Sequence, residues 1–336
     1  MFVEAFPRLA IRLRSTFPDA NIQLADDAKS IVIGFPASPN WEVRVSGIAC
    51  REHFLCIETS ITLYYECLRR LPEEDFNRFI AAENLGLRGA TILVEDSKGP
   101  RTLRLRATFI GQKGRSTDEA ENIAIDVISL LRFARMLEDR ILRSSVADEF
   151  SFELYYSTYL SKSIGRSRYI NYARNIFRGS TERVFGQVAR LFKEDHKYEV
   201  VFDRGLIANL RNPSIDFEIN FRIPDQIPMI ACSALLHTFE GKRRDSYALA
   251  SRLNSKVKFG HFEVSADGSK IFFATWKHLT NDLRLYSLDQ LLHSIHEAYW
   301  ILRKELAATV ASPEPVKDCS EDRTAALDAY EYRPAA

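Results

Sequence analysis

The sequence predicts an α+β protein built from two tandem copies of one unit, a helix-flanked antiparallel sheet. Several short segments have apolar residues at every second position, which is typical of strands in a sheet with one wet face. The segments between them have helical periodicity. Residues 1–145 and residues 181–308 present these segments in the same order, which indicates a duplication.

The first half shows the strand pattern at residues 41–47. Trp41, Val43 and Val45 alternate there with Glu42 and Arg44, so one face of this strand should be buried. The elements predicted for this half are a helix at residues 3–17, a hairpin at 21–35, strands at 41–47 and 53–65, a helix at 73–84, a hairpin at 88–109 that turns at 97–100, and a long helix from Ser116.

The second half repeats this order, and its strand signal is stronger. Residues 214–223 place Ile215, Phe217, Ile219, Phe221 and Ile223 on one face and polar residues on the other. Asp203–Gly205 and Asp267-Gly268 are hairpin turn signals. The elements predicted are a helix at residues 181–196, strands at 197–202, 206–211, 214–223 and 229–239, a helix at 246–254, a hairpin at 260–276 and a helix after Ser287.

Two spacings support the duplication. Gly89 to Ser116 and Gly260 to Ser287 both span 27 positions (116 − 89 and 287 − 260). Each closing helix also fits a capping box, Ser116 with Glu119 and Ser287 with Gln290. Because duplication preserves a mutual interface, we expect the two copies to pair within the chain as a pseudo-dimer.

The closing part of each copy carries a family resemblance. In the second copy a helix ends LNSKVKFG at residues 253–260, and a strand, the turn SADGSK, a second strand and a capped helix follow. The first copy matches as AENLGLRG, with Glu83 taken as the equivalent of Asn254, and has a longer turn. These patterns resemble the YbjN family, whose fold is that of the type III secretion chaperones. The resemblance implies a dimer-forming fold that engages extended segments of partner proteins, and it brings no catalytic residues.

Composition narrows the class of protein. Lys and Arg total 46 against 45 Asp and Glu, a balance that gives no global attraction to nucleic acid or to acidic membranes. The five cysteines, Cys50, Cys56, Cys67, Cys232 and Cys319, form no CxxC pair, which suits a reducing compartment. No apolar run is long enough for a membrane span. We therefore expect a soluble, cytoplasmic protein.

Catalytic and metal-binding patterns are weak. His293 and His296 have a spacing that could hold a metal, but no further ligand accompanies them. His261 and His278 could approach each other across the second hairpin, although wet-face histidines are the simpler interpretation. Cys56 and Cys67 fit small core residues better than nucleophiles. The acidic pairs lie at predicted turns and helix starts, where local structure explains them. The sequence thus predicts no enzyme, no cofactor and no metal.

Residues 146–180 connect the two copies and combine aromatic with basic side chains. Such a strip can bind a protein partner or stack nucleic-acid bases, or it can simply cement the two copies together. The candidate partner-binding residues are Tyr155, Tyr156, Tyr159, Arg166, Arg168 and Arg174. Residues 309–336 lack sustained periodicity and are expected to be a mostly disordered tail, in which Tyr330 and Tyr332 could form a short docking motif.

Three functions follow from these observations. The leading one is a non-catalytic chaperone, adaptor or regulator that holds a segment of a partner protein. The first alternative is a regulator that binds nucleic acid through the connector, and the second is a small-ligand protein or enzyme with a pocket between the copies.

Overall fold

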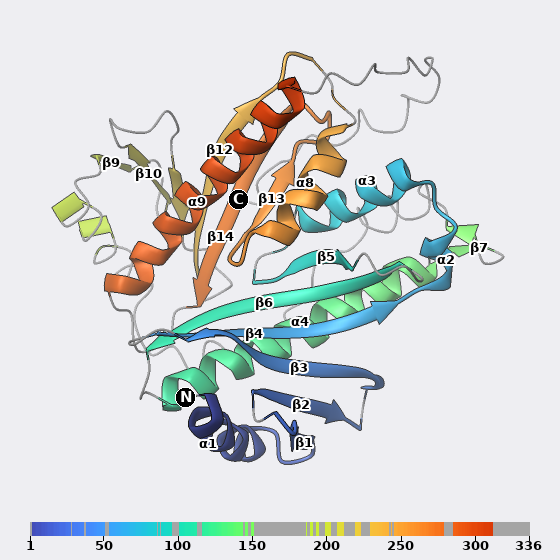
Figure 1. Cartoon of the computed structure of the whole chain (residues 1–336), viewed down its shortest axis with the longest axis vertical. Helices are drawn as coiled ribbons and strands as arrows, with labels where there is room; N and C mark the ends of the chain where they lie inside the picture. The colour runs from blue at the N-terminus through green and yellow to red at the C-terminus, as the bar shows by residue number, and fades with distance from the viewer. Residues whose placement is uncertain are drawn as a thin grey trace.

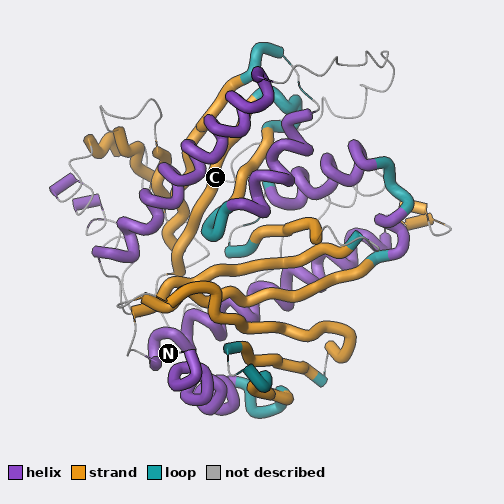
Figure 2. Tube along the Cα trace, in the orientation of Figure 1, coloured by secondary structure: helices purple, strands orange, loops and turns teal. Residues whose placement is uncertain are grey.

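A computed structural model shows an α+β protein with two antiparallel six-stranded sheets and, in the part of the chain that is described, six helices. The strands of the two sheets run in different directions, and helices cover one face of each (Figures 1 and 2). The structure describes residues 2–27, 29–36, 38–50, 54–85, 87, 89–95, 101–112, 116–143, 145–146, 149–150, 186, 189–190, 193–194, 199–202, 207–211, 219–222, 229–241, 243, 245–278 and 285–311.

The first sheet has the strand order β1-β2-β3-β4-β6-β5. Its elements are α1 (Phe2–Thr16), β1 (Asn21–Leu24), β2 (Ser30–Phe35), β3 (Ser38–Cys50), β4 (Phe54–Tyr64), α2 (Glu66–Arg69), α3 (Glu73–Asn84), β5 (Thr91–Glu95), β6 (Thr102–Gln112) and α4 (Ser116–Arg143). These positions confirm the predicted elements of the first half. The short helix α2 was not predicted.

The second sheet has the order β9-β10-β11-β12-β14-β13, which is the order of the first sheet strand for strand. Its elements are β9 (Glu199–Phe202), β10 (Ile207–Arg211), β11 (Ile219–Arg222), β12 (Met229–Thr238), α8 (Asp245–Lys256), β13 (His261–Val264), β14 (Lys270–His278) and α9 (Leu285–Ala311). A small hairpin of β7 (Ser145–Val146) and β8 (Glu149–Phe150) follows α4.

Each sheet buries the apolar face that the alternation predicts. In β3, Trp41, Val43 and Val45 are buried whereas Glu42 and Arg44 are exposed. In β11, Ile219 is buried in the second core. Helices α1 and α4 contact the first sheet, and α4 runs behind β4 and β6; α9 runs in front of β12 and β14 (Figure 1).

The predicted turn between β13 and β14 is confirmed. Asp267 accepts a hydrogen bond through Oδ1 from the backbone N–H of Ser269 (3.0 Å), and Gly268 has a φ of 74°. Asp27 accepts in the same way from the N–H of Lys29 (2.9 Å) in the turn between β1 and β2. These carboxylates serve local structure, as expected.

Three details of the predicted duplication need correction. Helix α9 begins at Leu285 and ends at Ala311, so Ser287 lies inside its first turn rather than at the N-cap, and the second unit extends past residue 308. Asn84, and not Glu83, is the equivalent of Asn254, because each asparagine bonds the strand residue eight positions later. Gly89 and Gly260 are not equivalent, since Gly260 directly precedes its strand and Gly89 stands two residues before β5.

Several predictions fall outside the described residues. They concern the turns at residues 97–100 and 203–205, most of the helix at 181–196, the outer part of the strand at 214–223, the connector from residue 151 and the segment after Ala311. In residues 181–196 the described positions, Gly186, Ala189, Arg190, Lys193 and Glu194, are helical. Among the described helices, none combines the length and the apolar character that a membrane span requires.

Candidate functional site

The two halves meet where helix α3 packs against helix α8. The contacts are reciprocal: α3 also touches β13 of the second half, and α8 also touches β5 of the first (Figure 1). Ala81 of α3 lies in the hydrophobic core of the second half. We refer to this region as the junction.

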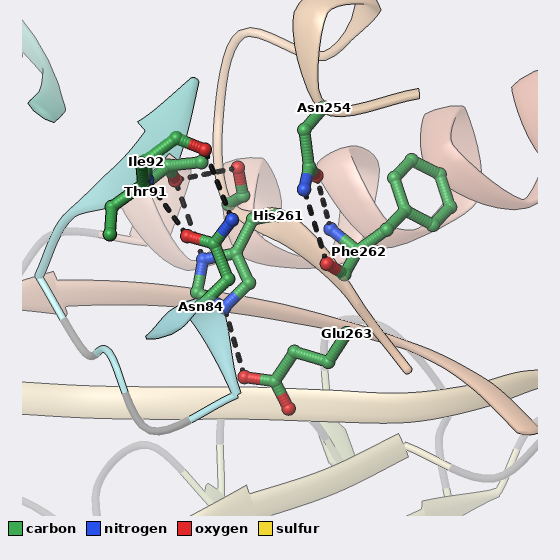
Figure 3. Close-up of polar contacts among 8 residues, drawn as sticks. Asn84, Thr91, Ile92, Asn254, His261, Phe262 and Glu263 are labelled. Atoms are coloured by element: carbon green, nitrogen blue, oxygen red, sulfur yellow. Dashed lines mark hydrogen bonds and ion pairs between the residues drawn. The ribbon is translucent and has the colours of Figure 1, made fainter. Parts of the chain in front are cut away.

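One asparagine on each side of the junction holds an edge strand to the helix before it. The side-chain amide of Asn84 donates to the carbonyl of Ile92 (3.0 Å) and accepts from its N–H (2.8 Å). Asn254 makes the same two bonds to Phe262, at 3.2 Å and 2.6 Å (Figure 3). Both asparagines are buried. Because β5 and β13 are edge strands, these outward-facing backbone groups would otherwise lack ladder partners.

A hydroxyl, an imidazole and a carboxylate form a row across the junction (Figure 3). The Thr91 hydroxyl donates to the carbonyl oxygen of Gly260 (3.3 Å), and its oxygen lies 3.4 Å from Nδ1 of His261. Nε2 of His261 lies 2.9 Å from a carboxylate oxygen of Glu263. One ring nitrogen therefore faces the Thr91 hydroxyl and the other faces a carboxylate oxygen of Glu263.

Arg106 of β6 reaches from the first half to the end of helix α8 in the second. Its Nη2 donates to the carbonyl oxygen of Val257 (2.9 Å) and reaches that of Asn254 at 3.5 Å. The last carbonyls of a helix lack partners within the helix and carry the negative end of its dipole. A guanidinium is thus well matched to this position. Burial lowers the pKa of Arg106, and the nearby Glu58 opposes that effect.

Charged side chains continue from Arg106 onto the outer face of the first sheet. Arg104 pairs with the carboxylates of Glu58 and Glu95. Cys56 lies beside Glu58 and Arg106, and burial raises the pKa of its thiol to about 11. Burial likewise raises the pKa of Cys232 to about 12. Neither thiol is a ready nucleophile near neutral pH, in line with the expectation for Cys56.

The row of Thr91, His261 and Glu263 has the order of groups found in nucleophilic hydrolases, but its burial points to a different role. The exposed fraction is 2% for Thr91, 0% for His261 and 5% for Glu263. A substrate carbonyl would have to reach a hydroxyl that is already bonded to the backbone of the opposite half. The row therefore serves to connect the two halves through buried polar contacts.

The predicted partner-binding residues Tyr155, Tyr156, Tyr159, Arg166, Arg168 and Arg174 all lie outside the described residues.

The structure describes both pairs of histidines that the sequence singled out, His293 with His296 and His261 with His278. His293 is exposed and His296 is half-buried, and burial followed by the charge of His293 lowers the pKa of His296. Within the described part of the chain, no three His, Cys, Asp or Glu side chains gather as metal ligands. The interpretation of His261 as a wet-face residue is wrong, because the side chain is fully buried. It lies opposite Ala274, while His278 lies opposite Met229, so the two histidines do not pair across strands.

Sequence reasoning missed the residues that form the junction. Thr91, Arg106 and Glu263 occupy outward positions of strands, where polar residues are ordinary. The sequence offered a signal for the two asparagines only. Asn84 and Asn254 each lie at the end of a predicted helix, eight residues before a residue of the next predicted strand.

Comparisons with known proteins place the chain in no family. No family model and no curated protein matches it. Among solved structures, the di-domain ARO/CYC StfQ from the steffimycin biosynthetic pathway aligns over 91% of this chain and 96% of its own, with 8% identity and a TM-score of 0.14. A likeness at that level supports no statement about fold or activity.

Proposed function

We propose that the chain is a tandem duplication whose copies pair as an intramolecular pseudo-dimer, related to the YbjN and type III secretion chaperone fold. Three observations support this proposal. The two sheets share one strand order, the halves touch through reciprocal contacts of α3 with β13 and of α8 with β5, and Asn84 and Asn254 make equivalent bonds. Reciprocity of this kind is what a two-fold interface requires.

For this pseudo-dimer we propose a non-catalytic role as a chaperone, adaptor or regulator that binds a segment of a partner protein. The observation that carries the proposal is the junction itself. Thr91, His261 and Arg106 make contacts between the two halves there, and Glu263 contacts His261. Chemistry at this place would require opening the molecule, whereas binding on the outer surfaces would not.

Affinity capture from native lysate tests this role. The full chain would be captured at low and at high salt, with mass spectrometry and a nucleic-acid stain applied to the same eluate. A connector variant, Tyr155→Ala with Tyr156→Ala and Arg168→Ala, would be compared with a control, Arg44→Ala, on the exposed face of β3. We expect a stoichiometric protein partner that survives high salt and is lost from the connector variant only.

Two other outcomes would overturn the proposal. Nucleic acid that is retained at low salt and released at high salt would identify a nucleic-acid regulator, because counterion release makes such binding steeply salt-dependent. Turnover of a small molecule by the purified chain, abolished by His261→Gln with the fold intact, would identify an enzyme that uses the junction.

A further inference from the structure

A group of basic and aromatic side chains lies at one end of the second sheet, away from the junction. We call it the basic–aromatic cluster: His237 and Phe239 at the end of β12, Arg243 before α8, and Tyr299 and Arg303 on α9. A β-bulge between Leu235 and His237 brings His237 opposite Ile271, a buried core-facing residue. The bulge therefore turns His237 to the face that α9 covers.

The rings and guanidinium groups of the cluster hold one another in place. Arg243 lies over the ring of Phe239, 4.9 Å from its centroid, and is anchored by Asp245. Arg303 lies over the ring of Tyr299 at 5.3 Å and donates from Nε to its hydroxyl (3.1 Å). The rings of His237 and Phe239 are 4.5 Å apart. Ordering two arginines in advance lowers the entropy cost of binding an anionic group.

Arg303 and Arg243 both act electrostatically on His237. Partial burial lowers the pKa of His237, and the charges of Arg303 and Arg243 lower it further. Residues 237–245 carry three cations, Lys242, Arg243 and Arg244, against Glu240 and Asp245. Trp300, beside Tyr299 and 68% exposed, adds an apolar surface.

The first half differs from the second at the position of His237. The position equivalent to His237 is Leu63, which lies opposite Leu103 as His237 lies opposite Ile271. Leu63 is buried in the first core. A ligand that contacts His237 would therefore find no imidazole at the equivalent place in the first half.

The segment that follows α9 has the complementary chemistry. Residues 312–336 hold six carboxylates and three cations, a net charge of −3 (3 − 6), so the rest of the chain carries +4 (1 + 3). Two of the carboxylates, Asp328 and Glu331, flank Tyr330. Arg303 lies eight residues before the end of α9 at Ala311, about 12 Å along the helix, and β12 ends at the same end of the second half (Figure 1). Fewer than ten extended residues would span that distance.

We propose that residues 312–336 dock on the basic–aromatic cluster. Carboxylates of the segment pair with Arg303 and the neighbouring cations, and Tyr330 and Tyr332 pack on Trp300. Tethering gives the segment an effective concentration on the order of millimolar, so an intramolecular contact with a dissociation constant well below that value is mostly occupied. An external acidic segment would have to displace it. This inference does not depend on the proposed function.

Acrylamide quenching of Trp300 fluorescence in the full chain tests the proposal, with the Trp300→Phe chain as background. Two variants remove the charge complementarity between the cluster and the segment. The first is Arg303→Glu, and the second replaces all six Asp and Glu residues of residues 312–336 with lysine. We expect each to raise the quenching constant of Trp300 about twofold or more, as does high salt, because docking shields the indole. The control Arg252→Glu, on the exposed side of α8, should change nothing.

Combining Arg303→Glu with the lysine segment should restore the wild-type quenching constant, which a merely local disturbance around Trp300 would not do. Equal accessibility of Trp300 in the wild-type and both single-sided variants would overturn the proposal. So would a combined variant that is as accessible as either alone.

Discussion

Glu83 of α3 and Arg140 of α4 form a buried ion pair. Nη1 of Arg140 lies 2.9 Å and 3.0 Å from the two carboxylate oxygens. Burial raises the pKa of Glu83 above its ordinary value of 4.5, and Arg140 opposes this shift only in part. Because the folded state holds this proton more tightly than the unfolded chain, the carboxyl contributes most to stability below pH 4.5. That contribution is lost as the pH rises through the raised pKa.

Glu83→Gln should therefore change stability in a pH-dependent way. Glutamine still accepts a hydrogen bond from Arg140 but carries no charge to bury. We expect the unfolding free energy of the variant, relative to wild type, to increase as the pH rises from 4.5 toward neutrality. Urea unfolding at several pH values measures this. Glu73→Gln, at the exposed first turn of the same helix, controls for the chemical change; a pH-independent difference for Glu83→Gln would refute the expectation.

Gly260 occupies a backbone position that combines a steric and a conformational demand. Its φ is +70°, and a Cβ at this position would overlap the carbonyl oxygen of Ala274 and the ring of Phe273. Gly241 offers a matched control, because its φ is +85° but no atom lies within 4 Å of the equivalent Cβ.

Replacing each of these glycines with alanine separates the two demands. We expect Gly241→Ala to cost about 1 kcal/mol of unfolding free energy, from backbone strain alone. Gly260→Ala should cost about 3 kcal/mol or more, because overpacking adds to the strain. Chemical denaturation of the two variants checks the difference, and equal losses would mean that the backbone near Ala274 relaxes freely.

At the scale of elements, each edge strand at the junction depends on the helix before it. Asn84→Ala or Asn254→Ala removes two hydrogen bonds and leaves buried backbone groups of Ile92 or Phe262 unsatisfied. We expect each substitution to cost about 2–4 kcal/mol, since each lost bond and each unpaired buried group adds to the loss. Thermal unfolding measures it. Ser255→Ala, next to Asn254 but exposed, should stay within about 0.5 kcal/mol of wild type; a comparable loss there would contradict the account.

The sequence was sufficient for most elements because their apolar periodicity is strong. Helix α3 was predicted at its observed bounds, and β3 was found from the alternation of Trp41, Val43 and Val45. Helix α2 has only four residues, too few to display a period. His261 was misplaced for another reason. An outward position on an edge strand is wet in an isolated unit, and here the first half covers it. Local periodicity contains no information about that second layer.

At the scale of the whole molecule, the two sides of the junction use equivalent helices and strands but place different side chains on them. Thr91 and Arg106 are paired across β5 and β6, and the equivalent pair across β13 and β14 is His261 and Ala274. Among the described residues, the first half alone thus supplies a guanidinium to the helix end opposite it. Two identical subunits would make such a contact twice, whereas here the position equivalent to Arg106 is Ala274, whose side chain has no donor.

This asymmetry makes Arg106 a test of how the halves cooperate. Arg106→Ala leaves the carbonyl oxygens of Val257 and Asn254 buried without their charged donor, at a cost of about 2–4 kcal/mol that falls on the junction rather than on either core. We expect thermal unfolding of the variant to broaden or separate into two transitions. Arg104→Ala is the matched control, two residues away on the same face and paired within the first half. If Arg106→Ala shifts a single transition without broadening it, the packing of α3 on α8 holds the halves together and the bonds of Arg106 do not couple them.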